Sequence, residues 1–361
     1  MSSEKSFLPL TRAHAFTARL GIRIPVLLAP MAGACPPSLS IAVAEAGGMG
    51  ACGAVLMSPD AIGKWADEFR QESEGEFQIN LWVPDPPPAR DAEAERRQRE
   101  FLAAWGPPVT SEAGDGVLPD FEGQCRAVIA ATPKAVSSIM GIYSPDFVAE
   151  MKERGILWLA TATTVDEARA AEAAGADAII AQGMEAGGHR GAFRADDAEA
   201  QMVGLFALLP QVCDAVEVPV IAAGGIADGR GVAAALILGA SAVQVGTGFL
   251  RAPEAKLPAP WAERLARTEA DQTRVTRAFS GRAGRGIRTH YVDAAASADA
   301  LPPAPYPVQR GLTRAMREEA VRIGDAERMQ MWAGQSARMA QAEPAGMIAQ
   351  RLWADALRFF S

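Results

Sequence analysis

The sequence has few of the side chains that bind transition metals. Its 361 residues include only 4 cysteines and 3 histidines. The cysteines (Cys35, Cys52, Cys125 and Cys213) are scattered, and neither a C-x-x-C pair nor a histidine at ligand spacing accompanies them. Structural zinc sites need such clusters. We therefore expect no metal site, and we expect the thiols to stay reduced.

Long hydrophobic runs and an excess of basic charge are also missing. The most apolar stretch, residues 232–245, is interrupted by Gly239 and is shorter than the roughly 20 residues of a membrane span. The N-terminal residues show no apolar segment of signal-peptide length. With 35 basic against 43 acidic side chains, the formal charge is −8. These features predict a cytoplasmic protein whose main partner is neither nucleic acid nor a membrane.

Apolar side chains make up 49% of the residues and occur in short runs separated by helical patterns. The runs lie at residues 25–28, 49–52, 77–81, 135–139, 156–160, 178–181, 220–222 and 242–245. This alternation is typical of βα units around a parallel sheet. Eight such units within about 250 residues predict an α/β fold of the (β/α)8 TIM barrel type. A doubly wound sheet is the alternative.

Two segments do not follow this repeat. Residues 84–119 begin with Pro-Asp-Pro-Pro-Pro and continue through a charged helical stretch into a loop rich in Gly and Pro. An insertion of this length after the third strand is typical of a lid. Residues 251–361 are rich in Arg, Met and Ala and show mostly helical patterns. We therefore expect a barrel over residues 1–250, with the insertion at 84–119, and a mainly helical extension over 251–361 that packs on it.

Glycines occur in patterns with different meanings. Residues 48–53 match G-x-G-x-x-G, but they follow a helical pattern and overlap the second predicted strand. A dinucleotide fingerprint needs a preceding strand and a helix that opens inside it, so a structural role is favoured. Gly224 and Gly225 follow the seventh predicted strand, and Gly246 and Thr247 follow the eighth. Because these two loops often bind phosphate in TIM barrels, we predict a ligand with a phosphate group.

One histidine lies where barrel enzymes hold catalytic groups. His189 follows the sixth predicted strand, directly after Gly187 and Gly188. An imidazole that titrates near neutrality suits removal of a proton from a weakly acidic C–H group. Asn80 and Gln244 lie on the third and eighth predicted strands, where their amides would face the barrel mouth. We predict that His189 is the catalytic base.

Other polar side chains are expected to have structural or solvated roles. His14 lies in the N-terminal segment and His290 lies beyond the barrel strands. Arg282, Arg285 and Arg288 lie on a glycine-containing turn. We interpret this turn as a solvated loop rather than an anion site.

Several segments together resemble class I nitronate monooxygenases, formerly called 2-nitropropane dioxygenases. They are PVLLAPMAG, QGMEAGGHRG, VPVIAAGGIADGRG, AVQVGTGFL and FSGRAGRGI, with ATATTVDEA and MWAGQSARMAQ. The resemblance spans nearly the whole chain, and the combination is specific although no single segment is. It implies an FMN-containing barrel that oxidises alkyl nitronates, or neutral nitroalkanes, with molecular oxygen to a carbonyl compound and nitrite. The chain departs from the family at Gly248, usually a larger residue, and in the turn 279–287, which lacks a proline.

The resemblance also implies roles for individual residues. His189 would remove the α-proton of a neutral nitroalkane, a step that a nitronate does not need. The resemblance implies that the isoalloxazine ring of FMN lies against Pro30 and Met31, with Asn80 and Gln182 near its polar edge. It implies that the chain passes close to the flavin at Gly187 and Gly188. The phosphate of FMN would be held by Gly224, Gly225, Gly246 and Thr247. Gln244 at the barrel mouth completes the expected cofactor-binding set.

Two other functions fit many of the same residues. A flavin reductase that takes hydride from NAD(P)H and reduces a quinone or an enoyl thioester would share the barrel and the cofactor. A flavin-free phosphate-sugar isomerase or lyase would use the phosphate loops for its substrate. It would also need a Lys or a carboxylate at a strand end, whereas Asp177 opens the sixth predicted strand and Lys134 precedes the fourth. The expected partners are a small nitronate or nitroalkane and O2, and a homo-oligomer is compatible with the Met- and Trp-containing tail.

Overall fold

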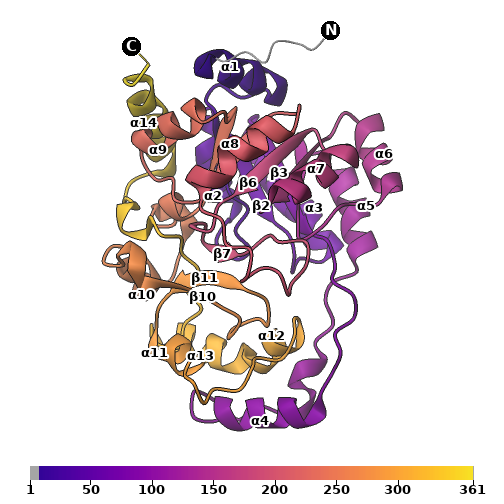
Figure 1. Cartoon of the computed structure of the whole chain (residues 1–361), viewed down its shortest axis with the longest axis vertical. Helices are drawn as coiled ribbons and strands as arrows, with labels where there is room; N and C mark the ends of the chain where they lie inside the picture. The colour runs from indigo at the N-terminus through magenta and orange to yellow at the C-terminus, as the bar shows by residue number, and fades with distance from the viewer. Residues whose placement is uncertain (1–7, 361) are drawn as a thin grey trace.

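The computed structural model describes residues 8–360, which form a parallel barrel with a smaller lobe beside one end (Figure 1). The barrel strands are β1 (Val26–Leu28), β2 (Gly50–Gly53), β3 (Phe77–Trp82), β4 (Ala135–Ile139), β5 (Leu157–Ala162), β6 (Ala178–Gln182), β8 (Val220–Ala223) and β9 (Ala242–Val245). They pair in the order β1-β9-β8-β6-β5-β4-β3-β2, and a backbone bridge between Leu27 and Met49 closes the ring. The predicted TIM barrel is confirmed. The doubly wound alternative is wrong, because such a sheet stays open.

A ring of helices covers the outside of the barrel. It contains α2 (Pro37–Glu45), α3 (Pro59–Glu72), α5 (Phe121–Ala131), α6 (Pro145–Glu153), α7 (Val165–Ala173), α8 (Leu205–Ala215), α9 (Gly229–Ile237) and α14 (Ala345–Leu357). Ser58, Ser144 and Asp228 accept hydrogen bonds from backbone N–H groups in the first turns of α3, α6 and α9, which satisfies donors that a helix leaves free. Within residues 8–360, no helix combines the length and the apolar character that crossing a membrane requires.

Helix α14 completes this ring although it comes from the end of the chain. It packs against α9, α2 and β1, the position that a helix following β9 takes in a TIM barrel. The predicted division at residue 250 therefore separates α14 from the barrel wall to which it contributes.

The barrel is filled with apolar side chains at the end where its strands begin. Helix α1 (Pro9–Leu20) places Phe16 and Leu20 in one cluster with Leu27, Met49 and residues of the other strands. A larger cluster of aliphatic side chains fills the space between the strands and the ring of helices. Because the first cluster closes the barrel at the end where its strands begin, the ligand cavity lies at the carboxyl ends of the strands.

The insertion and most of the extension form the second lobe. Its elements are α4 (Ala92–Leu102), η1 (Ser111–Asp115), α10 (Ala259–Leu265), η4 (Ala270–Gln272), β10 (Thr273–Thr276), β11 (Gly284–Ile287), α11 (His290–Ala294), α12 (Val308–Leu312), α13 (Arg314–Ile323) and η5 (Ala337–Met339). The short helix η3 (Pro253–Ala255) packs on α2 of the barrel instead. Leu102 of α4 shares one apolar cluster with Tyr291 and Leu312, and Gln98 donates to the carbonyls of Leu301 and Pro302. The insertion thus packs firmly against the extension (Figure 1).

A small antiparallel sheet joins this lobe to the barrel. Strand β7 (Gly188–His189) pairs with β11, which pairs with β10. His189 lies opposite Gly284 in this pairing. The extension therefore contains strands as well as helices. Its strand β11 pairs with β7, which belongs to the loop that follows β6.

Candidate functional site

A cavity of about 780 Å³ opens at the carboxyl ends of the barrel strands. This volume lies within the range of cofactor and ligand sites. All of the residues predicted to form the site line it: Pro30, Met31, Asn80, Gln182, Gly187, Gly188, His189, Gly224, Gly225, Gln244, Gly246 and Thr247. The fold thus brings to one cavity residues that are spread over most of the barrel sequence.

One side of the cavity is built from main chain. This phosphate-loop side consists of Gly224 and Gly225 after β8, and Gly246 and Thr247 after β9, where η2 (Thr247–Phe249) begins. Gly224 and Gly225 have φ values of 118° and 70°, in the region that favours glycine. The Thr247 hydroxyl accepts a hydrogen bond of 2.9 Å from the Gly334 N–H. Bare backbone in two adjacent loops, with a hydroxyl that can still donate, suits a bound phosphate.

Three side-chain amides lie at the inner end of the cavity. Asn80 donates to the backbone carbonyl and the hydroxyl of Ser137, both at 3.1 Å. Gln182 donates to the His189 carbonyl and accepts from the Gly191 N–H, so it holds the β6–β7 loop. Gln244 accepts a 3.0 Å bond from Gln78.

Gln78 was not among the predicted site residues. It is the second residue of β3 and is fully buried, and it also donates to the Leu28 carbonyl. This contact orients the Gln78 amide and, through it, leaves the Gln244 NH2 group available to the cavity. A polar residue two positions before Asn80 in an otherwise apolar run was the only signal in the sequence.

His189 lines a second part of the cavity, which we call the base side. Its ring makes edge contacts with Trp82 and Trp332, at centroid distances of 4.7 and 5.0 Å. Its Nε2 lies 2.8 Å from the Ser280 hydroxyl. Burial, and then the positive charges of Arg282 and Arg310, lower the pKa of His189 to about 3. The imidazole is therefore neutral at pH 7 and able to accept a proton.

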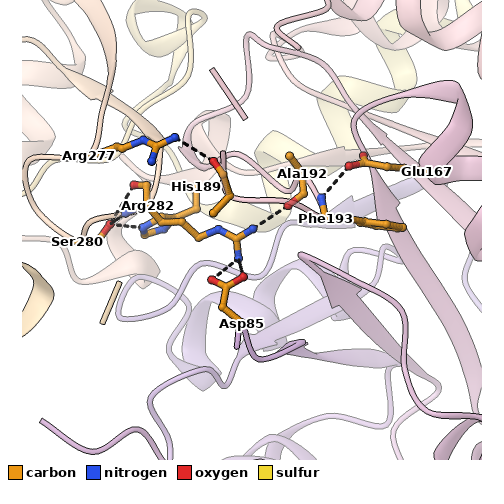
Figure 2. Close-up of polar contacts among 9 residues, drawn as sticks. Asp85, Glu167, His189, Ala192, Phe193, Arg277, Ser280 and Arg282 are labelled. Carbon is orange, nitrogen blue, oxygen red and sulfur yellow. Dashed lines mark hydrogen bonds and ion pairs between the residues drawn. The ribbon is translucent and has the colours of Figure 1, made fainter. Parts of the chain in front are cut away.

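The turn that carries Ser280 is not solvated, so our interpretation of its arginines was partly wrong. Arg282 is buried and donates to the Asp85 carboxylate at 2.9 Å and to the Ala192 carbonyl at 2.8 Å (Figure 2). Arg285 is buried as well and donates to the Met184 carbonyl. Only Arg288 of the three stays largely exposed. The pairing of β11 with β7 brings this turn under the barrel mouth, which local sequence patterns do not reveal.

Residues of the extension complete the base side and were also missed. Tyr306, Arg310 and Trp332 line the cavity, and Tyr306 lies 5.5 Å from Trp82 between ring centroids. Burial lowers the pKa of Arg310, and within residues 8–360 its guanidinium makes no hydrogen bond or ion pair. A half-buried cation without a carboxylate partner suits an anionic ligand. Nothing in the local sequence around these three residues marks them as cavity residues.

The cavity offers neither a reactive thiol nor a metal centre. Burial raises the pKa of Cys35 to about 12 and raises that of Cys52 well above its ordinary value, so both thiols stay protonated. Among the described residues, no group of three or more His, Cys, Asp or Glu side chains is placed to hold a metal ion. The chemistry of the site thus depends on the bound ligand, the imidazole and the arginine.

Comparisons with known proteins agree with this geometry. The profile of the nitronate monooxygenase family matches residues 14–355. A probable nitronate monooxygenase from Staphylococcus aureus strain MSSA476 is 36% identical over 343 residues, which cover 93% of this chain and 95% of that protein.

Two solved structures are similar to the whole chain. Nitroalkane oxidase from Streptomyces ansochromogenes has a TM-score of 0.86 and 36% identity, covering 95% of this chain and 98% of the other. FabK from Thermotoga maritima has a TM-score of 0.74 and 30% identity, covering 96% of each chain. The chain therefore belongs to the nitronate monooxygenase family, whose members are flavin-dependent oxidoreductases that act on small nitronates and nitroalkanes.

Proposed function

We propose that this enzyme binds FMN in the barrel cavity and oxidises alkyl nitronates with O2, giving a carbonyl compound and nitrite. The observation that carries the proposal is the composition of the cavity. Glycine loops suited to a phosphate form one side, and a neutral histidine beside an unpartnered arginine forms the other.

The residues present fit FMN, which combines a flat ring system with one phosphate. At Gly187, an added Cβ would lie 2.5 Å from the Gly334 nitrogen, so only glycine lets these two segments of the cavity wall lie this close together. The Trp261 N–H at the cavity wall is buried without a hydrogen-bond partner among the described residues. An orphaned donor in a partly apolar cavity indicates that a polar ligand belongs there.

We assign the residues of the cavity to parts of this cofactor. The phosphate would be held by Gly224, Gly225, Gly246 and Thr247. The ring would lie against Pro30 and Met31, with its polar edge facing Asn80, Gln182 and Gln244. The chain would pass close to the ring at Gly187 and Gly188. When bound, FMN would supply the redox chemistry that links oxidation of the substrate to reduction of oxygen.

The chain itself handles the proton and the negative charge of the substrate. Arg310 is the group that binds the anionic nitronate, because its guanidinium is available to the cavity. For a neutral nitroalkane, His189 first accepts the α-proton and becomes an imidazolium. Its low pKa opposes this charge, but the nitronate forms beside it and offsets the cost as an ion pair.

The proposal is tested by the visible spectrum of the purified protein under anaerobic conditions, before and after addition of an alkyl nitronate. Flavin bands that bleach with the nitronate would support direct reduction by the substrate. Bands that persist with the nitronate but bleach with NAD(P)H would replace the proposal with a reductase. A protein that neither contains nor binds FMN would indicate a flavin-free isomerase or lyase.

A further inference from the structure

Two segments that are distant in sequence from His189 meet behind it (Figure 2). Ser280 and Arg282 come from the turn before β11, and Asp85 comes from the start of the Pro-rich insertion. Ser280 is 91 residues from His189, and Asp85 is 197 residues from Arg282. The side chains of His189 and Ser280 are linked to the backbone of Arg282, and the Arg282 side chain is linked to Asp85.

The hydrogen bonds of Ser280 limit where the proton of His189 can reside. The Ser280 hydroxyl lies 2.8 Å from His189 Nε2 and 3.1 Å from the Arg282 carbonyl oxygen, and it accepts from the Arg282 N–H at 3.3 Å. A hydroxyl has a single proton to donate. If it donates to the Arg282 carbonyl, His189 must donate its Nε2–H to Ser280, and Nδ1 is then the unprotonated, basic nitrogen. If it donates to Nε2 instead, the ring proton is on Nδ1.

The first arrangement is the one that permits proton abstraction. His189 lines the cavity, and within residues 8–360 its Nδ1 has no hydrogen-bond partner. Nε2 is already occupied by Ser280. Nδ1 is therefore the nitrogen that can take a proton from a substrate, provided that Ser280 donates to Arg282.

Arg282 can accept this bond only if its backbone is held in place, and its side chain supplies the anchor. The guanidinium contacts both oxygens of Asp85, at 2.9 and 3.1 Å, and the Ala192 carbonyl. The Arg282 side chain is only 2% exposed, so water cannot readily replace these contacts. The neighbouring Ala283 carbonyl also accepts from the Arg190 N–H, which ties the turn to the residue after His189.

We propose that Arg282, anchored by Asp85, is a positioning residue that fixes the Nε2–H tautomer of His189 through Ser280 and so leaves Nδ1 as the base. The proposal rests on the proposed function only in giving His189 the role of base. The tautomer itself is a property of the protein. Asp85 lies in the Pro-rich insertion, so the insertion contributes to the site although it does not line the cavity.

The tautomer can be observed directly, because the chain has only three histidines. We would record imidazole ¹⁵N–¹H correlations of the holoprotein as purified and assign His189 by comparison with His14→Gln and His290→Gln. In the wild type we expect a protonated Nε2 and an unprotonated Nδ1. In Asp85→Ala and Asp85→Asn we expect a mixture with the Nδ1–H form.

A matched control variant comes from the same turn. Arg277 also makes an ion pair, with Glu199 at 3.0 Å, but neither residue contacts His189 or lines the cavity. Glu199→Gln removes a more exposed ion pair of the same turn and should leave the tautomer unchanged. Asp85→Glu should restore part of the wild-type signal. An Nδ1–H wild type, an unchanged tautomer in Asp85→Ala, or an equal change in Glu199→Gln would overturn the proposal.

Activity provides a second readout that depends on the proposed function. Asp85→Ala should lower kcat/KM for a neutral nitroalkane by roughly tenfold to a hundredfold, and it should change kcat/KM for the preformed nitronate by less than about twofold. In a Ser280→Ala background the Asp85 substitution should have no further effect on the nitroalkane. If no nitronate is oxidised but the tautomer changes as expected, the proposed function fails and the positioning role stands.

Discussion

The phosphate-loop side of the cavity is lined mainly by backbone groups, whereas the base side is lined by side chains. On the phosphate-loop side, backbone groups of Gly224, Gly225 and Gly246 face the ligand, and they directly follow β8 and β9. On the base side, side chains line the cavity, and they come from β3, β7 and the extension, with Asp85 of the insertion packed behind them. Local chain geometry is enough to form the first side, whereas the second exists only when distant segments are packed together. The two sides should therefore fail in different ways when single residues are changed.

The largest effect is expected on the phosphate-loop side. Gly225→Asp places a carboxylate against the phosphate, and two like charges about 4 Å apart repel by about 4 kcal/mol at an effective dielectric constant of about 20. This corresponds to a roughly thousandfold loss of FMN affinity, measured by fluorescence titration of the apoprotein. Gly225→Asn is the control, because Asn has the same shape and also tolerates the positive φ of 70° at this position. Equal losses in the two variants would show that backbone strain, not charge, is responsible.

The next largest effect is expected on the base side. His189→Asn removes the proposed base, and general base catalysis typically contributes about a hundredfold to ten-thousandfold. We expect a loss of this size in kcat/KM for neutral nitroalkanes, with FMN affinity and oxidation of preformed nitronates largely retained. Steady-state kinetics with each form of one nitro compound measures the difference. Equal loss on both forms would refute the role of His189 as base.

A smaller effect would sharpen the assignment of the base side. Arg310→Gln removes the proposed partner of the anionic substrate, and hydrogen bonds to charged groups contribute about 1.5–3 kcal/mol. We expect KM for the nitronate to rise by roughly tenfold or more, with a much weaker effect on the neutral nitroalkane. Arg314→Gln is the matched control, since Arg314 is exposed and pairs with Glu318. A KM unchanged in Arg310→Gln would place the anion elsewhere in the cavity.

The smallest expected effect is the contribution of His189 to the pH dependence of folding stability. The ordinary pKa of His is 6.5, whereas in the folded protein that of His189 is lowered to about 3 by burial and by the nearby arginines. Between these values the unfolded chain binds more protons than the folded one, so stability falls as pH falls, by at most about 1.4 kcal/mol per pH unit. His189→Gln should reduce the drop in Tm between pH 7 and pH 5. The control is His14→Gln at an exposed position, which should leave this drop in Tm unchanged. An identical drop in Tm in both variants would contradict the neutral state of His189.

Much of the barrel could be predicted from the sequence because its signals are local. Each strand is a short apolar run, and each of the runs overlaps a strand in the structure. The phosphate loops were recognised because they follow two of these strands in known order. Helix α14 could not be recognised as part of the barrel, because its amphipathic pattern does not say which strand it covers.

The base side shows the limit of such reasoning. His189 stood out because it is a single imidazole at a strand end, but its partners lie far along the chain. Arg282 looked like a residue of a solvated turn, since charged residues near glycines usually face water. Its burial depends on the ion pair with Asp85, and no local pattern connects these two residues.

The sequence by itself determined the barrel, the order of its strands and the placement of the glycine loops, because backbone conformation and the burial of apolar runs follow from neighbouring residues. Tertiary structure alone decided the electrostatic state of the base side. The low pKa of His189, the unpartnered Arg310 and the buried Arg282–Asp85 pair all depend on which charges come close together and how much water is excluded. These quantities depend on distance and burial in three dimensions, which a linear pattern of residues does not contain.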